Sequence, residues 1–334
     1  MLLKRLALIV GATGLLAIPA IAEQCSTPTE LSAADKSAID QAVGRFNQSV
    51  IAGDANGLKA NAIPAVAGAF DQIAGTIQQM QTQVAGAHSD VTFEYLLTQD
   101  NKDTVDAKFY CGTFDPGKVA NSQEVRVSFE IPKLPPGQYA FAISEVTGGR
   151  TPYKISYVLQ QEGGQWKLAG FYPKPAQAAG HDGVWFWKQA RDFKAKGQTH
   201  DAWFYLTTAQ DLLQPVGFID TTNLDKLFQE QSQIQPPDVP VDKPVTFTSS
   251  DGKSFTLNQM FTTTDDKGNL VLVVKYAVPD ISNTGAAFQQ NQALASALVQ
   301  KYPEFKQAFA SLVPRATAPT GQDFGSEFKM SDLK

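Results

Sequence analysis

The stretch from Tyr153 to Tyr172 reads YKISYVLQQEGGQWKLAGFY. In its first half the large apolar side chains recur at every second residue, which is the period of a β-strand with one buried face: Tyr153, Ile155, Tyr157 and Leu159. In its second half Trp166, Leu168 and Gly170 alternate with Lys167, Ala169 and Phe171. The Glu162-Gly163-Gly164 turn between the halves supplies glycines, which adopt the positive φ of a tight hairpin without strain. The stretch therefore predicts two long antiparallel strands.

The beginning of the chain has the three-part pattern of a secretory signal peptide. Lys4 and Arg5 precede an apolar run from residue 6 to 18, and Pro19 and the small-residue sequence Ala20-Ile21-Ala22 follow. We expect residues 1–22 to be removed after Ala22 and the protein to be periplasmic or secreted, with no membrane span. Lipid attachment at Cys25 is disfavoured, because Glu23 and Gln24 stand where lipoproteins carry small residues.

Size and charge limit the classes of partner. Without the signal, 312 of the 334 residues remain, enough for two domains with their own cores. Loss of Lys4 and Arg5 takes the net charge from −5 to −7, and no basic run occurs elsewhere, so a nucleic-acid partner is not expected.

Two cysteines remain after signal removal, Cys25 and Cys111. An even pair in an exported protein most simply forms one disulfide, here across a loop of about 85 residues. A redox or metal-binding pair is the alternative, but there is no C-x-x-C spacing and no histidine cluster.

The N-terminal part predicts helices followed by an antiparallel meander. A helix begins near Ser32 with Asp35 and carries Ile39, Val43 and Phe46 on one face, and Pro64 opens a second long helix that runs to Val84. Strands are expected at 91–98, 106–113, 124–131 and 138–146, before the hairpin. Helices and then strands indicate an α+β domain over 23–175, with helices on one face of a curved sheet.

The phrase FNQSVIAGD at 46–54, followed much later by GQWKLAGFY at 164–172, resembles the NTF2-like (cystatin-like cone) superfamily, particularly its small secreted bacterial members. The resemblance covers about residues 30–175. It implies a cone-shaped pocket between the helices and the sheet, in a superfamily that includes isomerases, cyclases and non-enzymatic binding domains. The inward face of the first helix, formed by Ile39, Val43, Phe46 and Val50, has no Tyr or Asp where the isomerases carry acid-base groups, so the resemblance assigns no catalytic residue.

Beyond Pro175 the pattern becomes helical and then mixed. Residues 176–234 predict a helical extension whose first hairpin resembles a single tetratricopeptide unit, and 235–243 read as a proline-rich linker. Residues 244–334 predict a second, small α+β domain. Its run Leu270 to Val274 should be buried on both faces, and its last strands, including 312–317, should lie at sheet edges.

Common catalytic and metal-binding signatures are missing from the sequence, and we expect no cofactor and no metal. His88, His181 and His200 stand singly, and the last two read as helix-start residues. The acidic groups at Asp100, Asp103 and Asp106, and at Asp265 and Asp266, lack the spacing of calcium loops and read as solvated turns.

Aromatic residues are concentrated between 139 and 205. Most are expected to pack between the cone and the helical hairpin, because each ring buries a large area. The alternative is a ligand cavity, for which Tyr139, Phe141, Tyr157 and Trp166 are the candidate binding residues.

Three functions stay open. The leading hypothesis is a non-enzymatic exported module that binds a small apolar ligand or an envelope protein. An isomerase or cyclase would use Tyr139 or Tyr157 with Glu94 or Glu145, both pointing into the cone. A scaffold would present an exposed apolar groove along Phe193, Tyr205 and Ala209.

Overall fold

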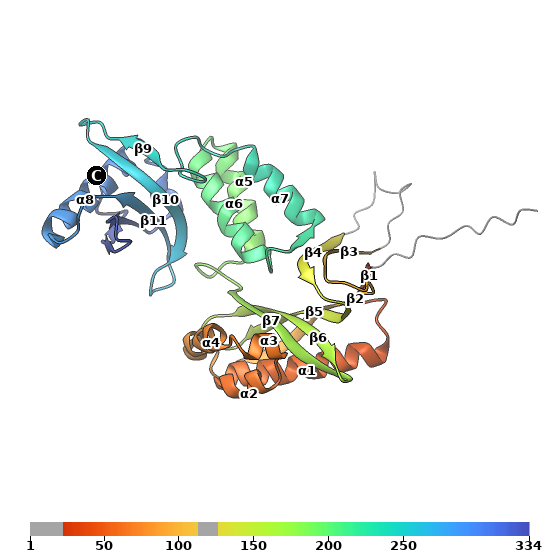
Figure 1. The fold of residues 1–334 in the computed structure, drawn as a ribbon. Helices are drawn as coiled ribbons and strands as arrows, with labels where there is room; N and C mark the ends of the chain where they lie inside the picture. Colours follow the sequence, from red (N-terminus) through yellow and green to blue (C-terminus); the bar gives the residue numbers. More distant parts are fainter. Residues whose placement is uncertain (1–22, 113–125, 334) are drawn as a thin grey trace, which may run out of the picture.

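The computed structural model describes residues 23–112 and 126–333, so the predicted signal peptide lies outside the described residues. The chain is α+β, with helices and largely antiparallel sheets (Figure 1). Three sheets are present in the described part of the chain.

The first sheet is antiparallel and has the order β1-β2-β5-β6-β7. Its strands are β1 (Glu23–Ser26), β2 (His88–Gln99), β5 (Gly137–Thr147), β6 (Tyr153–Glu162) and β7 (Gln165–Pro175). The predicted hairpin is confirmed: β6 pairs with β7, and Gly163 and Gly164 take φ values of 59° and 78° in the turn. Side chains larger than glycine are strained at such values, which explains the Gly-Gly pair.

The register of this hairpin slips by one residue. Val158 faces Gly170, whereas Leu159 faces Leu168, so β7 has one extra residue there. A bulge of this kind reverses which side chains share a face. Phe171 therefore packs in the same core as Trp166 and Leu168, and the strict alternation expected from the sequence is wrong at this point.

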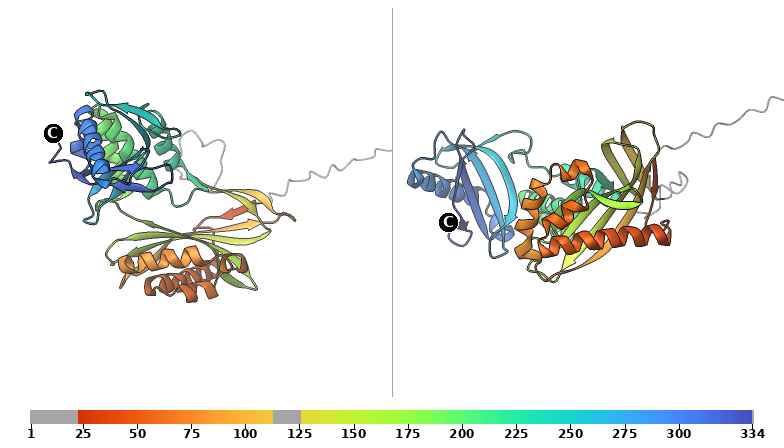
Figure 2. Two further views of the ribbon diagram at one scale, coloured as in Figure 1. Left: turned by 60° about the vertical axis from the view of Figure 1, so that its left-hand side comes forward. Right: turned by 60° about the horizontal axis from the view of Figure 1, so that its bottom comes forward.

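Four helices cover one face of the first sheet (Figures 1 and 2). They are α1 (Ala33–Ala52), α2 (Ala55–Ala60), α3 (Pro64–Ala67) and α4 (Asp71–Val84). The Ser32 side chain caps α1 by accepting from the backbone N–H of Asp35, as the sequence indicated. The single helix expected from Pro64 to Val84 is interrupted between Ala67 and Asp71.

A small sheet lies against the face of the first sheet that the helices leave open. It has the order β3-β4-β8, from β3 (Val105–Cys111), β4 (Val127–Leu134) and β8 (Ile219–Thr221). The predicted disulfide is confirmed: Cys25 in β1 bonds Cys111 in β3 across 86 residues. It joins the edge strand of the first sheet to the small sheet.

The rest of the chain forms the helices α5 (Gly183–Ala195), α6 (Thr199–Leu213) and α7 (Thr222–Ser232) and a C-terminal sheet. That sheet has the order β13-β12-β11-β10-β9, with β14 also paired to β12. Its elements are β9 (Val245–Thr248), β10 (Ser254–Thr264), β11 (Leu270–Ala277), α8 (Thr284–Lys301), α9 (Phe305–Ala308), β12 (Ser311–Thr317), β13 (Asp323–Gly325) and β14 (Phe328–Lys329).

Two expectations about the C-terminal sheet have different outcomes. Leu270 to Val274 are all buried in β11, as their continuous apolar character predicted. β12, expected at an edge, instead lies inside the sheet, parallel to β11 and flanked on its other side by β13 and β14. The helical segment α8 supplies the long crossover that a parallel pair requires.

The aromatic residues of α5 and α6 pack against the C-terminal part rather than against the first sheet. The Phe204 ring lies 5.9 Å from that of Phe309, and the Tyr205 hydroxyl donates to the carbonyl oxygen of Ala308 at 2.8 Å. One apolar core accordingly spans α5, α6 and the C-terminal sheet. The aromatic packing predicted between the cone and the helical hairpin therefore occurs between that hairpin and the C-terminal sheet.

Within the described residues, no helix is both long enough and apolar enough to cross a membrane.

Candidate functional site

The four aromatic residues expected to bind a ligand do not line one cavity. Tyr157 and Trp166 lie in the core between the first sheet and the helices α1–α4. Tyr139 and Phe141 lie on the other face, in the core shared with the small sheet. The structure brings together the members of each pair and separates the two pairs by the thickness of the sheet.

Tyr157 is engaged inside the helix-covered core. Its hydroxyl donates to Oδ1 of Asn47 at 2.7 Å, and Nδ2 of Asn47 donates to Oγ of Ser144 at 2.9 Å. All three residues are buried, and burial raises the pKa of Tyr157 well above its usual range. The hydroxyl serves the internal packing of α1 on the sheet and has no route to a ligand in this state.

The carboxylates proposed for acid-base chemistry lie on opposite faces. Glu94 is buried under α1, where Oε1 accepts from Nζ of Lys36 at 2.6 Å; burial, followed by the neighbouring Asp40, raises its pKa. Glu145 lies on the other face, 3.8 Å from Nζ of Lys154. Of the two tyrosines, Tyr139 shares that face but donates its hydroxyl to the carbonyl oxygen of Pro135. On neither face of the sheet do a tyrosine hydroxyl and a carboxylate both lie free for a substrate.

The predicted scaffold groove is also not present at the residues named for it. Phe193, Tyr205 and Ala209 are buried in the core that joins α5 and α6 to the C-terminal sheet. A partner protein has no access to these side chains, so this form of the scaffold hypothesis is wrong.

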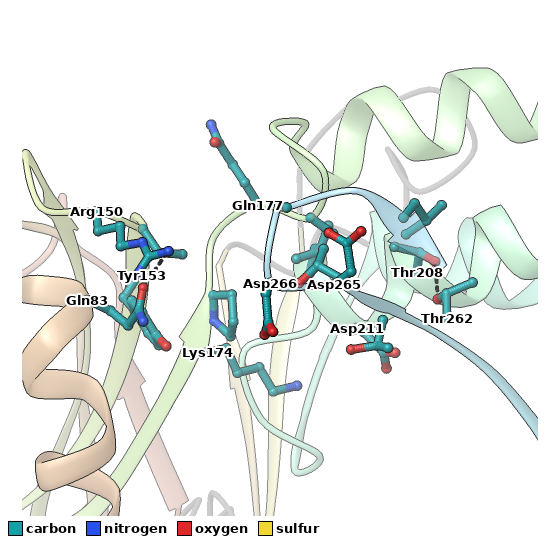
Figure 3. A pocket seen from close by; sticks show the side chains of 18 of the residues that line it. Gln83, Arg150, Tyr153, Lys174, Gln177, Thr208, Asp211, Thr262, Asp265 and Asp266 are labelled. Atoms are coloured by element: carbon teal, nitrogen blue, oxygen red, sulfur yellow. Dashed lines mark hydrogen bonds between the residues drawn. The ribbon is translucent and has the colours of Figure 1, made fainter. Parts of the chain in front are cut away.

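A polar cleft of about 1000 Å³ lies where the first sheet, α6 and the C-terminal sheet meet (Figure 3). One wall comes from the end of α4, the β5–β6 turn and the end of β7. The other comes from α6 and from the β10–β11 hairpin with its turn. Segments far apart in the sequence thus line a single cavity, which is at the upper end of the size range of ligand sites.

The first wall is fixed by contacts between α4 and the β5–β6 turn. The carbonyl oxygen of Gln83 accepts from the backbone N–H of Arg150 at 2.7 Å, and its Oε1 accepts from Oγ1 of Thr151 at 2.9 Å. Gly149 makes this approach possible, because a Cβ there would lie 2.4 Å from the Gln83 carbonyl oxygen. The exposed Arg150 side chain is consequently held beside the cleft.

The second wall is fixed by hydroxyl and carboxylate contacts. Oγ1 of Thr208 on α6 lies 2.6 Å from Oγ1 of Thr262 on β10. In the β10–β11 turn, the Asp265 carboxylate accepts from the backbone N–H groups of Lys267 and Asn269, at 2.8 Å each. Asp265 therefore shapes the turn, which leaves the neighbouring Asp266 exposed at the cleft.

Charges of both signs converge on this space. Arg150 and Lys174 come from the first wall, and Asp211 and Asp266 from the second. Asp211 keeps contact with solvent although protein surrounds it; this partial desolvation raises its pKa, with Lys174 acting in the opposite direction. With the amides of Gln79, Gln83 and Gln177, the cleft offers donors, acceptors and both charges to a polar ligand.

No local sequence pattern indicates this cleft. The Asp265-Asp266 pair has the pattern of a solvated turn, and Lys174 lies between two prolines without a functional motif. The lining residues come from α4, the β5–β6 turn, the end of β7, α6 and the β10–β11 hairpin, so no spacing along the chain links the two walls.

The histidines and acidic groups do not form a metal site in the part of the chain that the structure describes. No three His, Cys, Asp or Glu side chains in residues 23–112 and 126–333 are placed to hold a metal ion. His181 stacks on Trp185 at 3.6 Å between ring centroids, beside the Asp182 side chain that caps α5. His200 Nε2 lies 2.8 Å from Oδ1 of Asp238.

No protein-family model, curated protein or solved structure matches the chain.

Proposed function

We propose that this protein is an exported, non-enzymatic binding module that holds a polar ligand in the cleft between its first sheet, α6 and its C-terminal sheet. One observation carries the proposal: Arg150, Lys174, Asp211 and Asp266, from four separate elements or turns, all line one cavity of about 1000 Å³. Charged side chains from distant segments that line one concave space are typical of a binding site, whereas charges that only interact with solvent need no such arrangement.

The proposal keeps the resemblance to NTF2-like proteins and changes the place of the ligand. Helices on one face of an antiparallel sheet support that resemblance for about residues 30–175. The space between helices and sheet is filled by apolar side chains such as Phe46, Ile77 and Leu168, which are at most 1% exposed. The sequence predicts an apolar ligand in the cone; the present proposal is instead a polar ligand in the cleft.

Export is supported by two features. The N-terminal sequence has the pattern of a signal peptide, and the Cys25–Cys111 disulfide is typical of proteins outside the reducing cytoplasm. The proposed setting is the bacterial cell envelope.

The test is native mass spectrometry of the protein purified from the envelope of its own host, compared with the same sample after denaturation. We expect a polar molecule that is bound in the native spectrum and absent from the denatured one. A disulfide mass deficit in the denatured spectrum would check the oxidation state of the same sample.

Two variants locate the bound molecule. The double variant Arg150→Gln/Asp266→Asn removes one charge from each wall, and we expect the retained molecule to be lost. Arg45→Gln/Asp100→Asn makes the same changes at exposed positions outside the cleft and should retain it. Retention by the cleft variant would place the ligand elsewhere, and a ligand-free native spectrum of the unaltered protein would contradict a tightly held small molecule.

A further inference from the structure

A second cavity of about 210 Å³ lies on the face of the first sheet opposite the helices α1–α4. Its walls are largely apolar and include Phe93 and Tyr95 on β2, Ile143 on β5, and the segment after α6 with Pro215 and Ile219. Phe93 is 51% exposed although it is a large apolar residue at this wall. Exposed apolar surface at a concave site is typical of a place where a ligand binds.

This apolar pocket adjoins the polar cleft. Lys174 and Leu212 line both cavities, so these two side chains stand at their common boundary. Nζ of Lys174 is held there by donating to the carbonyl oxygen of Gln214 at 3.0 Å. A ligand in the cleft could therefore extend one apolar group past Lys174 into the pocket.

The volume of the pocket limits the size of the ligand group that it can hold. A cavity of about 150 Å³ lined by apolar side chains holds one benzene molecule. The pocket, at about 210 Å³, accommodates a single aromatic ring or a large branched aliphatic group with its first carbon.

The mouth of the pocket carries balanced charge. Lys154 and Glu145 lie 3.8 Å apart at the rim, and Lys174 is near Asp211 of the cleft. An isolated anion or cation would gain little from such paired charges. A neutral group with hydrogen-bond donors and acceptors, such as a peptide bond, matches this rim and the Gln and Thr side chains of the cleft better.

We propose that the ligand is a peptide segment that lies along the polar cleft and places one aromatic or large aliphatic side chain in the apolar pocket. The proposal rests on the proposed function, because the cleft supplies the binding surface for the backbone. It adds a selectivity: the pocket ranks peptides by the side chain at one position. Recognition of this kind combines backbone hydrogen bonds with one specificity pocket.

The test uses two blocked pentapeptides, serine-glycine-X-glycine-serine, with phenylalanine or alanine at X. Binding to the full-length mature protein is measured by isothermal titration and by chemical-shift changes in ¹⁵N-labelled protein. We expect the phenylalanine peptide to bind about tenfold more tightly or better, because burial of a phenyl group is worth at least one decade in affinity. Shifts should include the backbone amides of residues 93, 143 and 213.

Ile143→Phe fills the pocket from β5 and should reduce the preference for phenylalanine over alanine to near one. The matched control is Ile131→Phe, which makes the same change at a half-buried position of the same core, outside the pocket. Should Ile143→Phe fail to fold, Leu213→Phe fills the pocket from the opposite wall.

The outcomes separate the two proposals. Equal affinity for both peptides, or a preference for phenylalanine that is unchanged in Ile143→Phe, overturns the inference about the pocket. The proposal that the cleft binds a ligand then still stands. If Arg150→Gln/Asp266→Asn binds the phenylalanine peptide with unchanged affinity and still prefers it over the alanine peptide, the role of the cleft is overturned and that of the pocket is kept. Binding of benzyl alcohol as tight as that of the phenylalanine peptide, or no binding of either peptide, overturns the peptide as the ligand.

Discussion

The Lys174 ammonium donates to the carbonyl oxygen of Gln214 at 3.0 Å, and this contact joins the end of β7 to the segment that follows α6. The same lysine lines both the polar cleft and the apolar pocket. A single side chain therefore connects two walls of the candidate site and sets the boundary between its two cavities.

Replacement of that lysine should loosen the wall after α6. We expect Lys174→Met to lower the free energy of unfolding by about 1–2 kcal/mol, because a charge-assisted hydrogen bond to a carbonyl is lost. Exchange of the backbone amide hydrogens should accelerate at residues 212–214 and 216. The control is Lys167→Met, which removes the 3.1 Å ion pair with Glu162 at the hairpin surface and should cost at most about 0.5 kcal/mol. Equal effects of both variants would contradict the role of Lys174.

The buried network of Tyr157, Asn47 and Ser144 should contribute to stability rather than to binding. Tyr157→Phe leaves Oδ1 of Asn47 without its donor in a buried core, and we expect the free energy of unfolding, measured in urea, to fall by about 1–3 kcal/mol. Peptide affinity should not change. Tyr110→Phe is the control, because that side chain is 73% exposed, and its effect should stay within about 0.5 kcal/mol. A binding defect in Tyr157→Phe would return the helix-covered core to consideration as a ligand site.

Asp201 should make stability depend on pH. It is fully buried in the first turn of α6 with no hydrogen-bond partner for either carboxylate oxygen, and burial, followed by the nearby Glu304, raises its pKa to about 7. The unfolded value is about 3.9. The folded state therefore holds a proton between these values that the unfolded state releases, so stability from this group falls as pH rises from about 4 to about 7, by up to roughly 4 kcal/mol.

Asp201→Asn removes this titration. Relative to the unaltered protein, the variant should be more stable at about pH 8 and similar in stability at about pH 4, as measured by urea midpoints across this range. Asp71→Asn makes the same change at an exposed position in the first turn of α4 and is the control. If the urea midpoints of Asp201→Asn and the unaltered protein change with pH in parallel, the Asp201 carboxyl does not hold a proton in the folded state.

Loss of the disulfide should destabilise the small sheet and β1 together. Cys25→Ser/Cys111→Ser opens a loop of 86 residues, for which the chain-entropy estimate is roughly 4 kcal/mol. Urea unfolding should shift accordingly, and a reductant should produce the same shift in the unaltered protein and none in the variant. An unchanged midpoint would show that pairing of β1 with β2 holds the N-terminal strand by itself.

Local patterns predicted much of the first sheet. Alternation and the Gly-Gly turn were enough for β6 and β7, and Ser32 with Asp35 was enough for the start of α1, because these signals arise within a few residues. The disulfide could be predicted because a chain with the pattern of a signal peptide has two cysteines after that segment. Strand pairing further along the chain was harder, as the interior position of β12 shows.

Two kinds of information were missing from the sequence pattern. The bulge opposite Val158 and Leu159 is set by tertiary pairing, and it moves Phe171 to the face of Trp166. The placement of α5 and α6 depends on which apolar surface they bury, and the sequence did not distinguish the first sheet from the C-terminal one. The cleft depends on both, so its residues could not be predicted before the elements were in place.

The small sheet has a consequence for the order in which the chain can acquire its final form. Phe129 of β4 pairs with Ile219 of β8, so the outer strand of this sheet lies about 90 residues downstream of its neighbour. A chain that emerges N-terminus first, during synthesis or translocation, can complete the first sheet and its helices while β4 still has one open edge. Ile219 also lines the apolar pocket, which therefore closes late, after α6 has been delivered. Binding competence should thus appear as a separate, later kinetic phase than formation of the helix-covered sheet.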